Sequence, residues 1–127
     1  MKLLLDTCAF IWAADAPAKL SATATGLIKD PQNDLTVSVA SLWEIGIKLK
    51  LNKLHIFANI LGLIQAAEAQ NIEIIPIPPM ATHIITTLPM HHTDPFDRII
   101  VATAMVSNVP VVTIDTAFDL YGVNRLW

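Results

Sequence analysis

The segment from His91 to Ala104 constrains the fold of this chain most strongly, because it indicates the beginning of a buried helix. Asp94 suits the N-cap of that helix, and Pro95 suits its first position. Beyond Asp97 the helix has almost no polar face, its apolar residues being Ile99, Ile100, Val101, Ala102, Ala104, Met105 and Val106. A helix this apolar lies inside a domain. We therefore expect the carboxylate of Asp97 to lie where the core meets solvent.

The composition limits what that carboxylate can do. A chain of 127 residues fits one domain, residues 1–127, with a single sizeable core. Hydrophobic residues make up 54% and charged residues 15%, which excludes disorder and indicates that a partner covers some apolar surface. The net charge of −3 argues against general electrostatic binding of nucleic acid. A polyanionic substrate would therefore need clustered cations or a bound metal.

The sequence also predicts a compartment. The single cysteine, Cys8, permits no internal disulfide and fits a reducing environment. The run Leu3–Leu5 begins like a secretory signal, but Asp6 and Asp15 interrupt the apolar stretch. No apolar run approaches the roughly 18–20 residues that a membrane span requires. We therefore expect a cytoplasmic protein that does not enter a membrane.

Predicted strands alternate with predicted helices along the chain. We expect strands at residues 2–5, 35–39, 72–76 and 111–114, with an edge strand at 123–127. We expect helices at residues 8–14, 21–29, 40–50, 56–69, 80–88 and 95–107, with a helical turn at 116–121. This alternation predicts an α/β fold, with a parallel sheet covered by helices on both faces.

Four acidic residues occupy related places in this predicted fold. Asp6 and Asp115 follow predicted strands, Asp97 opens a helix, and Glu44 lies one turn into the helix after the second strand. In parallel sheets, ligands bind beyond the carboxyl ends of the strands. Carboxylates that converge there repel one another, so they require a cation. Oxygen ligands suit Mg²⁺ or Mn²⁺, and such ions support hydrolysis of phosphodiesters.

Each of these acids also has a purely structural interpretation, which the spacing leaves open. Asp6 and Asp115 could cap the helical segments that follow them, and Asp97 could complement a helix dipole. Glu44 could be an exposed ion-pair partner of Lys48, four residues further along the same helix.

Three neighbouring polar residues have weaker claims to a site. Asp94 is expected to be the N-cap. The adjacent residues His91 and His92 should point apart, and no second pair has the spacing of a zinc site, so we expect surface or capping roles for them. Whether Asp94 or the histidine pair assists the site stays open. The chain has no glycine-rich phosphate loop, which argues against an NTPase or a dinucleotide enzyme.

Four stretches together resemble the PIN-domain family, and most closely its VapC-like branch, the ribonucleases of type II toxin–antitoxin pairs. They are Leu3–Thr7, Ser41–Ile45, His92–Arg98 and Val112–Asp115. They occur in family order and span essentially the whole chain. The resemblance implies one PIN-like nuclease domain, a three-layer α/β/α sandwich around a mainly parallel central sheet.

The resemblance also implies an activity, a cofactor and a catalytic set. Asp6, Glu44 and Asp97 match the core acidic positions of the family, and Asp115 matches the more variable fourth. These four residues are the expected catalytic and metal-ligating residues, holding Mg²⁺ or Mn²⁺. The implied reaction is endonucleolytic hydrolysis of RNA that leaves a 5′-phosphate and a 3′-hydroxyl.

Hydroxyl and cationic residues complete the expected substrate-binding set. The resemblance implies that Thr7, Thr113 and, more weakly, Ser41 hold a bound water or orient a carboxylate. Lys48, Lys50, Lys53 and Arg98 are expected to contact flanking phosphates; a solvated surface position remains the alternative for each lysine. For Arg98 the alternative is an ion pair with an aspartate at the start of its own helix. The only basic cluster consists of Lys48, Lys50 and Lys53.

The family resemblance implies protein partners as well as RNA. A cognate antitoxin, a homodimer and a toxin–antitoxin hetero-oligomer are all expected. Candidate contact residues are Trp12, Trp43, Trp127 and the apolar residues between 49 and 57.

Three other protein classes fit the sequence less well. A receiver-like domain would require a lysine after the last core strand, where this chain has Thr113-Ile114-Asp115. A haloacid-dehalogenase-type phosphatase would require Asp-x-Asp after the first strand, where this chain has Asp6-Thr7-Cys8. A non-catalytic PIN-like binding module would lose acids, and all four are present.

Overall fold

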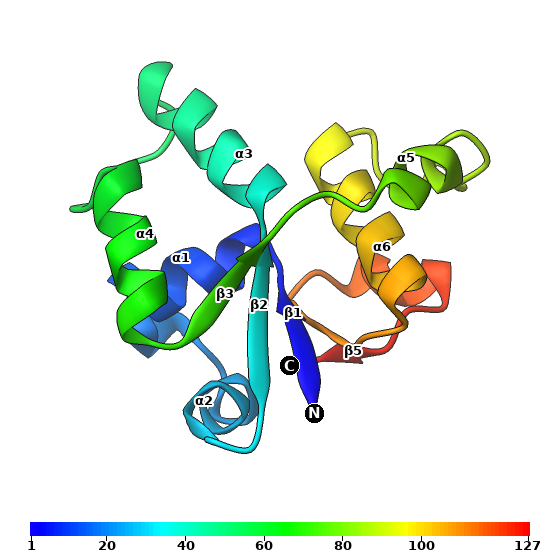
Figure 1. Ribbon diagram of the computed structural model, residues 1–127. Helices are drawn as coiled ribbons and strands as arrows, with labels where there is room; N and C mark the ends of the chain where they lie inside the picture. The colour runs from blue at the N-terminus through cyan, green and yellow to red at the C-terminus, as the bar shows by residue number, and fades with distance from the viewer.

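A five-stranded sheet separates two groups of helices in the computed structural model, which describes residues 1–127 (Figure 1). Its strands are β1 Lys2–Leu5, β2 Asp34–Ser38, β3 Ile72–Ile75, β4 Val111–Val112 and β5 Arg125–Leu126. The α-helices are α1 Thr7–Asp15, α2 Ala22–Lys29, α3 Val39–Lys50, α4 Ile60–Ala69, α5 Pro79–Ile85 and α6 Pro95–Ser107. Two 3-10 helices complete the chain, η1 Pro17–Lys19 and η2 Thr116–Tyr121.

The sheet is entirely parallel, with strand order β3-β2-β1-β4-β5. The central strand β1 pairs with β2 on one side and with β4 on the other, so that Leu4 lies opposite both Thr36 and Val111. The strand order reverses between β1 and β4, because the chain adds β2 and β3 on one side and later β4 and β5 on the other. The predicted α/β/α sandwich with an edge strand at the end of the chain is confirmed.

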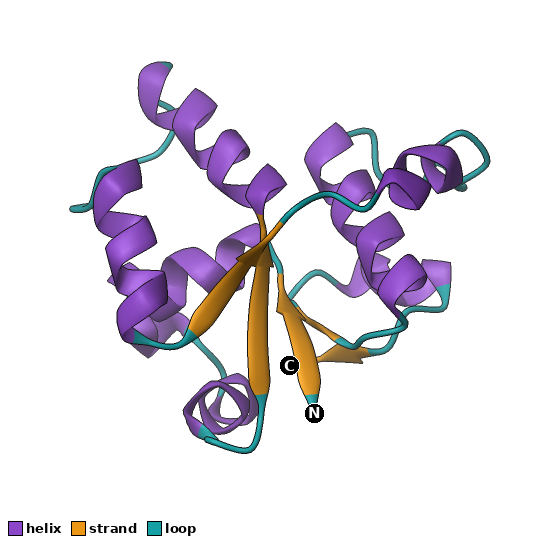
Figure 2. Cartoon of the chain, viewed as in Figure 1, coloured by secondary structure: helices purple, strands orange, loops and turns teal.

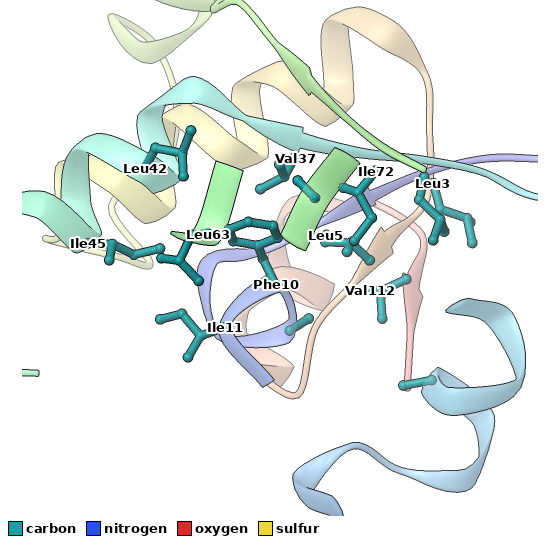
Figure 3. Close-up of a cluster of buried hydrophobic side chains, with 14 residues drawn as sticks. Leu3, Leu5, Phe10, Ile11, Val37, Leu42, Ile45, Leu63, Ile72 and Val112 are labelled. Carbon is teal, nitrogen blue, oxygen red and sulfur yellow. The ribbon is translucent and has the colours of Figure 1, made fainter. Parts of the chain in front are cut away.

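Helices cover both faces of the sheet, and each face has its own apolar core. Helices α1, α3 and α4 lie together on one side, and α5 and α6 lie on the other (Figures 1 and 2). Phe10 of α1 and Leu63 of α4 meet Leu5 and Val37 of the sheet in the first core (Figure 3). Such two-sided coverage explains why β1 is a continuous apolar run, with Leu3–Leu5 fully buried.

Helix α6 forms the centre of the second core, as predicted. Residues 98–104 are all buried, and Asp94 is the N-cap, accepting a hydrogen bond from the backbone N–H of Phe96 at 2.8 Å. The helix ends at Asn108, which adopts the left-handed conformation (φ 50°) that commonly terminates helices. The first turn, with Asp97, therefore emerges at the edge of the core.

Three predicted boundaries are wrong. The helix expected over 56–69 begins only at Ile60, because Asn59 caps it by accepting from the N–H of Gly62 at 2.8 Å. The helix expected over 80–88 is α5, Pro79–Ile85. The strand expected over 111–114 pairs only at Val111–Val112.

None of the helices combines the length and apolarity that crossing a membrane would need.

Candidate active site

The four acidic residues lie around the carboxyl ends of the central strands, where the strand order reverses. Asp6 directly follows β1, Asp115 follows β4, Glu44 lies in α3 after β2, and Asp97 lies in the first turn of α6. Their charges act on one another: Glu44 and Asp115 both raise the pKa of Asp6 and that of Asp97. The structure therefore places all four predicted carboxylates within range of one another's charge.

Asp6 is held by two donors. It caps α1 by accepting from the backbone N–H of Ala9 at 2.7 Å, and its other oxygen accepts from the hydroxyl of Thr113 at 2.5 Å. Burial nevertheless raises the pKa of Asp6 to about 6, because desolvation of the charged form outweighs both hydrogen bonds. Asp6 is thus the cap of α1, as the structural interpretation expected, and it also lies among the other acids of the candidate site.

Glu44 is buried, with 4% of its surface exposed. The hydroxyl of Thr7 donates to one of its oxygens at 2.7 Å, and the ammonium of Lys48 donates to the other at 2.5 Å. The pair with Lys48 that the structural interpretation offered is present, but Glu44 is buried and not exposed as that interpretation had it. The hydrogen bond to Glu44 raises the pKa of Lys48.

The carboxylate of Asp97 has no hydrogen-bond donor within the protein, unlike those of Asp6, Glu44 and Asp115. The side chain of Asp97 is half-buried at the start of α6. Burial raises the pKa of Asp97 to about 6, and the nearby charge of Asp94 raises it further. An ionised Asp97 therefore needs a cation more than its neighbours do.

Asp115 has an unexpected partner in His92. The Nε2 atom of His92 lies 2.7 Å from a carboxylate oxygen of Asp115, whose other oxygen accepts from the N–H of Ala117 at 2.9 Å. Burial acts to raise the pKa of Asp115, but the hydrogen bonds from His92 and Ala117 outweigh it and hold the pKa below its ordinary value. The expectation of a surface or capping role is wrong for His92, whose side chain is 9% exposed. His91 is exposed.

The predicted hydroxyl residues act on carboxylates. Thr7 and Thr113 each donate to an acid of the site, and the hydroxyl of Ser41 lies 2.9 Å from that of Thr7. Ser41 and Thr113 are fully buried. These contacts fit the expectation that the hydroxyls orient carboxylates of the site.

Arg98 does not occupy the position expected of a phosphate-binding residue. Its buried guanidinium donates to four backbone carbonyls of the segment before α6, those of Ile85, Leu88, Pro89 and His92, at 2.9–3.4 Å. It forms no ion pair with Asp94 or Asp97. Arg98 thus anchors the loop that leads into α6, and only 8% of its surface is exposed.

A hollow of about 390 Å³ opens beside Glu44, between α3 and the start of α6. Lys48 and Lys53 line it together with Asp94 and Phe96. Two cations next to the carboxylates give an acidic protein a local means of holding phosphate. Lys48 therefore keeps its place among the candidate phosphate contacts, although it also pairs with Glu44.

The donor set fits a hard divalent cation. It consists of carboxylate oxygens, the ligands that Mg²⁺ and Mn²⁺ prefer. The possible ligand atoms of His92, Asp97 and Asp115 all lie within 4.8 Å of one another, a group that does not include Asp6 or Glu44. Burial raises the pKa of both Asp6 and Asp97, as expected where carboxylates are placed to be neutralised by a bound ion.

A comparison with protein families gives an independent assignment. The family model described as PIN domain matches residues 3–124 of the sequence. Among proteins with curated annotation, none matches the sequence significantly.

Solved structures share the fold over nearly the whole chain. One is VapBC2 from Rickettsia felis bound to a DNA fragment from its promoter, at 17% identity and a TM-score of 0.70, covering 98% of this chain and 97% of that chain. VapC20 of Mycobacterium tuberculosis, described as a toxin that cleaves the sarcin–ricin loop, has 15% identity and a TM-score of 0.63, with 95% of each chain covered. A toxin–antitoxin complex from Klebsiella pneumoniae has 19% identity and a TM-score of 0.56, covering 90% of this chain and 87% of that chain.

Proposed function

Because the chain belongs to the PIN-domain family, we propose that it is a metal-dependent endoribonuclease that acts as the toxin of a type II toxin–antitoxin pair. The observation that carries this proposal is the convergence of Asp6, Glu44, Asp97 and Asp115 at the point where the strand order reverses. The similarity of the fold to that of a sarcin–ricin loop-cleaving toxin supports RNA as the substrate.

The four carboxylates are the residues that would hold Mg²⁺ or Mn²⁺. When bound, such an ion lowers the pKa of a water molecule and stabilises negative charge on phosphoryl oxygens. Asp97 has no protein donor, so its carboxylate is free to turn toward the ion. Asp6 and Glu44 are fixed in orientation by the hydroxyls of Thr113 and Thr7.

The remaining residues of the site handle the substrate. Lys48 and Lys53 line the hollow beside Glu44, where they can contact the phosphates that flank the cleaved bond. Lys48 can exchange its partner Glu44 for a phosphate once an ion binds the carboxylates.

Exposed apolar side chains support the proposed protein partners. Trp43 is 64% exposed, and Leu51, Phe57 and Leu61 are exposed around the connection between α3 and α4. Large exposed apolar side chains that cluster in this way mark protein interfaces. We propose a cognate antitoxin or a second copy of the chain as the occupant, because similar folds occur in a toxin–antitoxin complex.

The test compares the purified wild-type protein with Asp97→Asn on total RNA, in EDTA, Mg²⁺ or Mn²⁺. We expect cleavage only by the wild type and only with metal, and a rate for the variant reduced at least about 100-fold, because a ligand matters no less than its supporting residues. Asp34→Asn is the matched control, since Asp34 is exposed at the first residue of β2, at the end of that strand opposite to the site.

Two outcomes would contradict the proposal. Equal cleavage by wild type and Asp97→Asn would indicate a contaminating nuclease or a wrong assignment of Asp97. Absence of cleavage by both proteins, together with absence of Mn²⁺ binding in a calorimeter, would favour a non-catalytic binding module with the same fold.

A further inference from the structure

The side chain of His92 is enclosed between the segment before α6 and the turn after β4. Its ring packs edge-on against Phe118, with centroids 5.3 Å apart, and lies parallel to the ring of Tyr121, with an interplanar angle of 6°. The ring is almost fully covered, with 9% of the side chain exposed. A polar ring that is buried this far requires partners for its nitrogen atoms.

Both ring nitrogens of His92 have such partners. Nε2 lies 2.7 Å from Asp115, and Nδ1 lies 2.9 Å from the hydroxyl of Tyr121. An ionised carboxylate has no proton to donate, so Nε2 carries the proton and donates it to Asp115, whether or not the ring is charged. The Tyr121 hydroxyl can donate to Nδ1 or accept from it, and so it supports the same ring orientation in both states.

The backbone of His92 is fixed as well. Arg98 donates to the carbonyl of His92 at 3.4 Å and to that of Pro89 at 2.9 Å, which anchors the loop on which the histidine lies. Asp115, in contrast, is the most exposed carboxylate of the site, with 39% of its side chain accessible. His92 is therefore a fixed donor to the second oxygen of a carboxylate whose first oxygen caps η2.

We propose that His92 is a positioning residue of the metal site, donating a hydrogen bond that holds the carboxylate of Asp115 beside that of Asp97. The ring acts through Asp115 and is not itself a ligand, because its Nε2 proton is already donated to the carboxylate. This inference rests on the proposed function, since it concerns the same metal site. Residues that support ligands in this way typically change metal affinity 10–100-fold.

The experiment measures the dissociation constant of Mn²⁺ by titration calorimetry, on the metal-free full chain without RNA. The variants are His92→Leu, which removes both hydrogen bonds, and His92→Gln, whose amide can still donate to Asp115. Tyr121→Phe removes only the hydroxyl that orients the ring. His91→Leu is the matched control, because His91 contacts Tyr121 by its ring but has no hydrogen bond to an acid.

We expect His92→Leu to weaken Mn²⁺ binding roughly 10–100-fold, while His92→Gln stays within about threefold of the wild type. Tyr121→Phe should have an intermediate effect, and His91→Leu none. This rescue by glutamine separates the hydrogen bond from packing, because both variants lose the contacts of the ring with Phe118.

Three results would overturn the inference. Unchanged affinity in His92→Leu would show that Asp115 needs no support. Equal losses in His92→Leu and His92→Gln would show that the ring is a direct ligand or acts only by packing. Absence of Mn²⁺ binding by the wild type would contradict both the proposed metal site and the proposed function. The first two results would contradict only the role of His92 and would leave the proposed function intact.

Discussion

The carboxylates of Asp6 and Asp97 both have a pKa raised to about 6, but the regions that carry them are built differently. Asp6 lies at the end of the central strand and accepts hydrogen bonds from Ala9 and Thr113. Asp97 lies on the first turn of α6 and accepts none, and its helix is approached by a loop that Arg98 anchors. Asp6 is therefore held in place by hydrogen bonds to its own carboxylate. Asp97 is held in place by helix α6, whose preceding loop Arg98 anchors.

The largest expected effect tests that anchoring. Arg98→Lys keeps the charge but cannot satisfy four carbonyls, so we expect the free energy of unfolding to fall by about 3 kcal/mol. Urea denaturation measures it. Arg125→Lys, which weakens an exposed pair with Asp119, should cost about 0.5 kcal/mol or less. If Arg98→Lys lowered the free energy of unfolding as little as Arg125→Lys, Arg98 would not anchor the loop before α6.

The second effect is the pH dependence of the metal-free protein. Both acids have a folded pKa of about 6 against an ordinary value of 3.8, so the native state binds more protons between these values. Stability should therefore fall as pH rises from about 4 to 7, by about 3 kcal/mol, most of it from buried Asp6 because the contribution of Asp97 is discounted for solvent screening. Asp115, with a lowered pKa, contributes only below this window.

Thermal or urea denaturation in EDTA across this pH range measures the effect. The double variant Asp6→Asn/Asp97→Asn is the reference, since it retains every other titrating group. The difference between wild type and this variant should shrink toward low pH and should reverse in saturating Mn²⁺, because the ion stabilises the ionised carboxylates. A difference that does not vary with pH would show that the two acids titrate normally.

The smallest effect separates the two acids directly. Asp97→Asn loses no hydrogen bond and removes a repelled charge, so we expect the metal-free protein at pH 7.5 to gain about 1 kcal/mol after allowance for screening. Asp6→Asn removes a similar charge but weakens the bonds from Thr113 and Ala9, so its gain should be clearly smaller. Urea denaturation in EDTA measures both, and equal gains would show that the donors of Asp6 contribute nothing.

Sequence reasoning predicted the acids of the site because each occupies a place that the fold determines. Strand ends and helix N-caps can be predicted from local patterns, so Asp6, Asp94 and Asp115 were placed correctly, and the apolar run after Asp97 predicted its buried helix. The parallel sheet followed from the alternation of elements in the same way.

His92 and Arg98 could not be placed from sequence, because their partners carry no local signal. Arg98 bonds to backbone carbonyls, which every residue has, so nothing in the sequence separates it from an arginine that contacts phosphate. His92 depends on Tyr121, which lies 29 residues away, and on a turn whose position only the packed fold determines. The start of α4 at Ile60 was missed because the apolar residues before it continue the helical pattern.

The pairing of β1 with β4 has a consequence for how this protein is synthesised. Strand β1 can pair with β4 only after residue 111 has been translated. The hydrogen bond between Asp6 and Thr113 likewise joins residues 107 positions apart. A nascent chain can form β1 and β2 early, but it cannot assemble all four acids before Asp115 leaves the ribosome. A product of interrupted translation that ends before residue 115 therefore lacks one of the four acids of the candidate site.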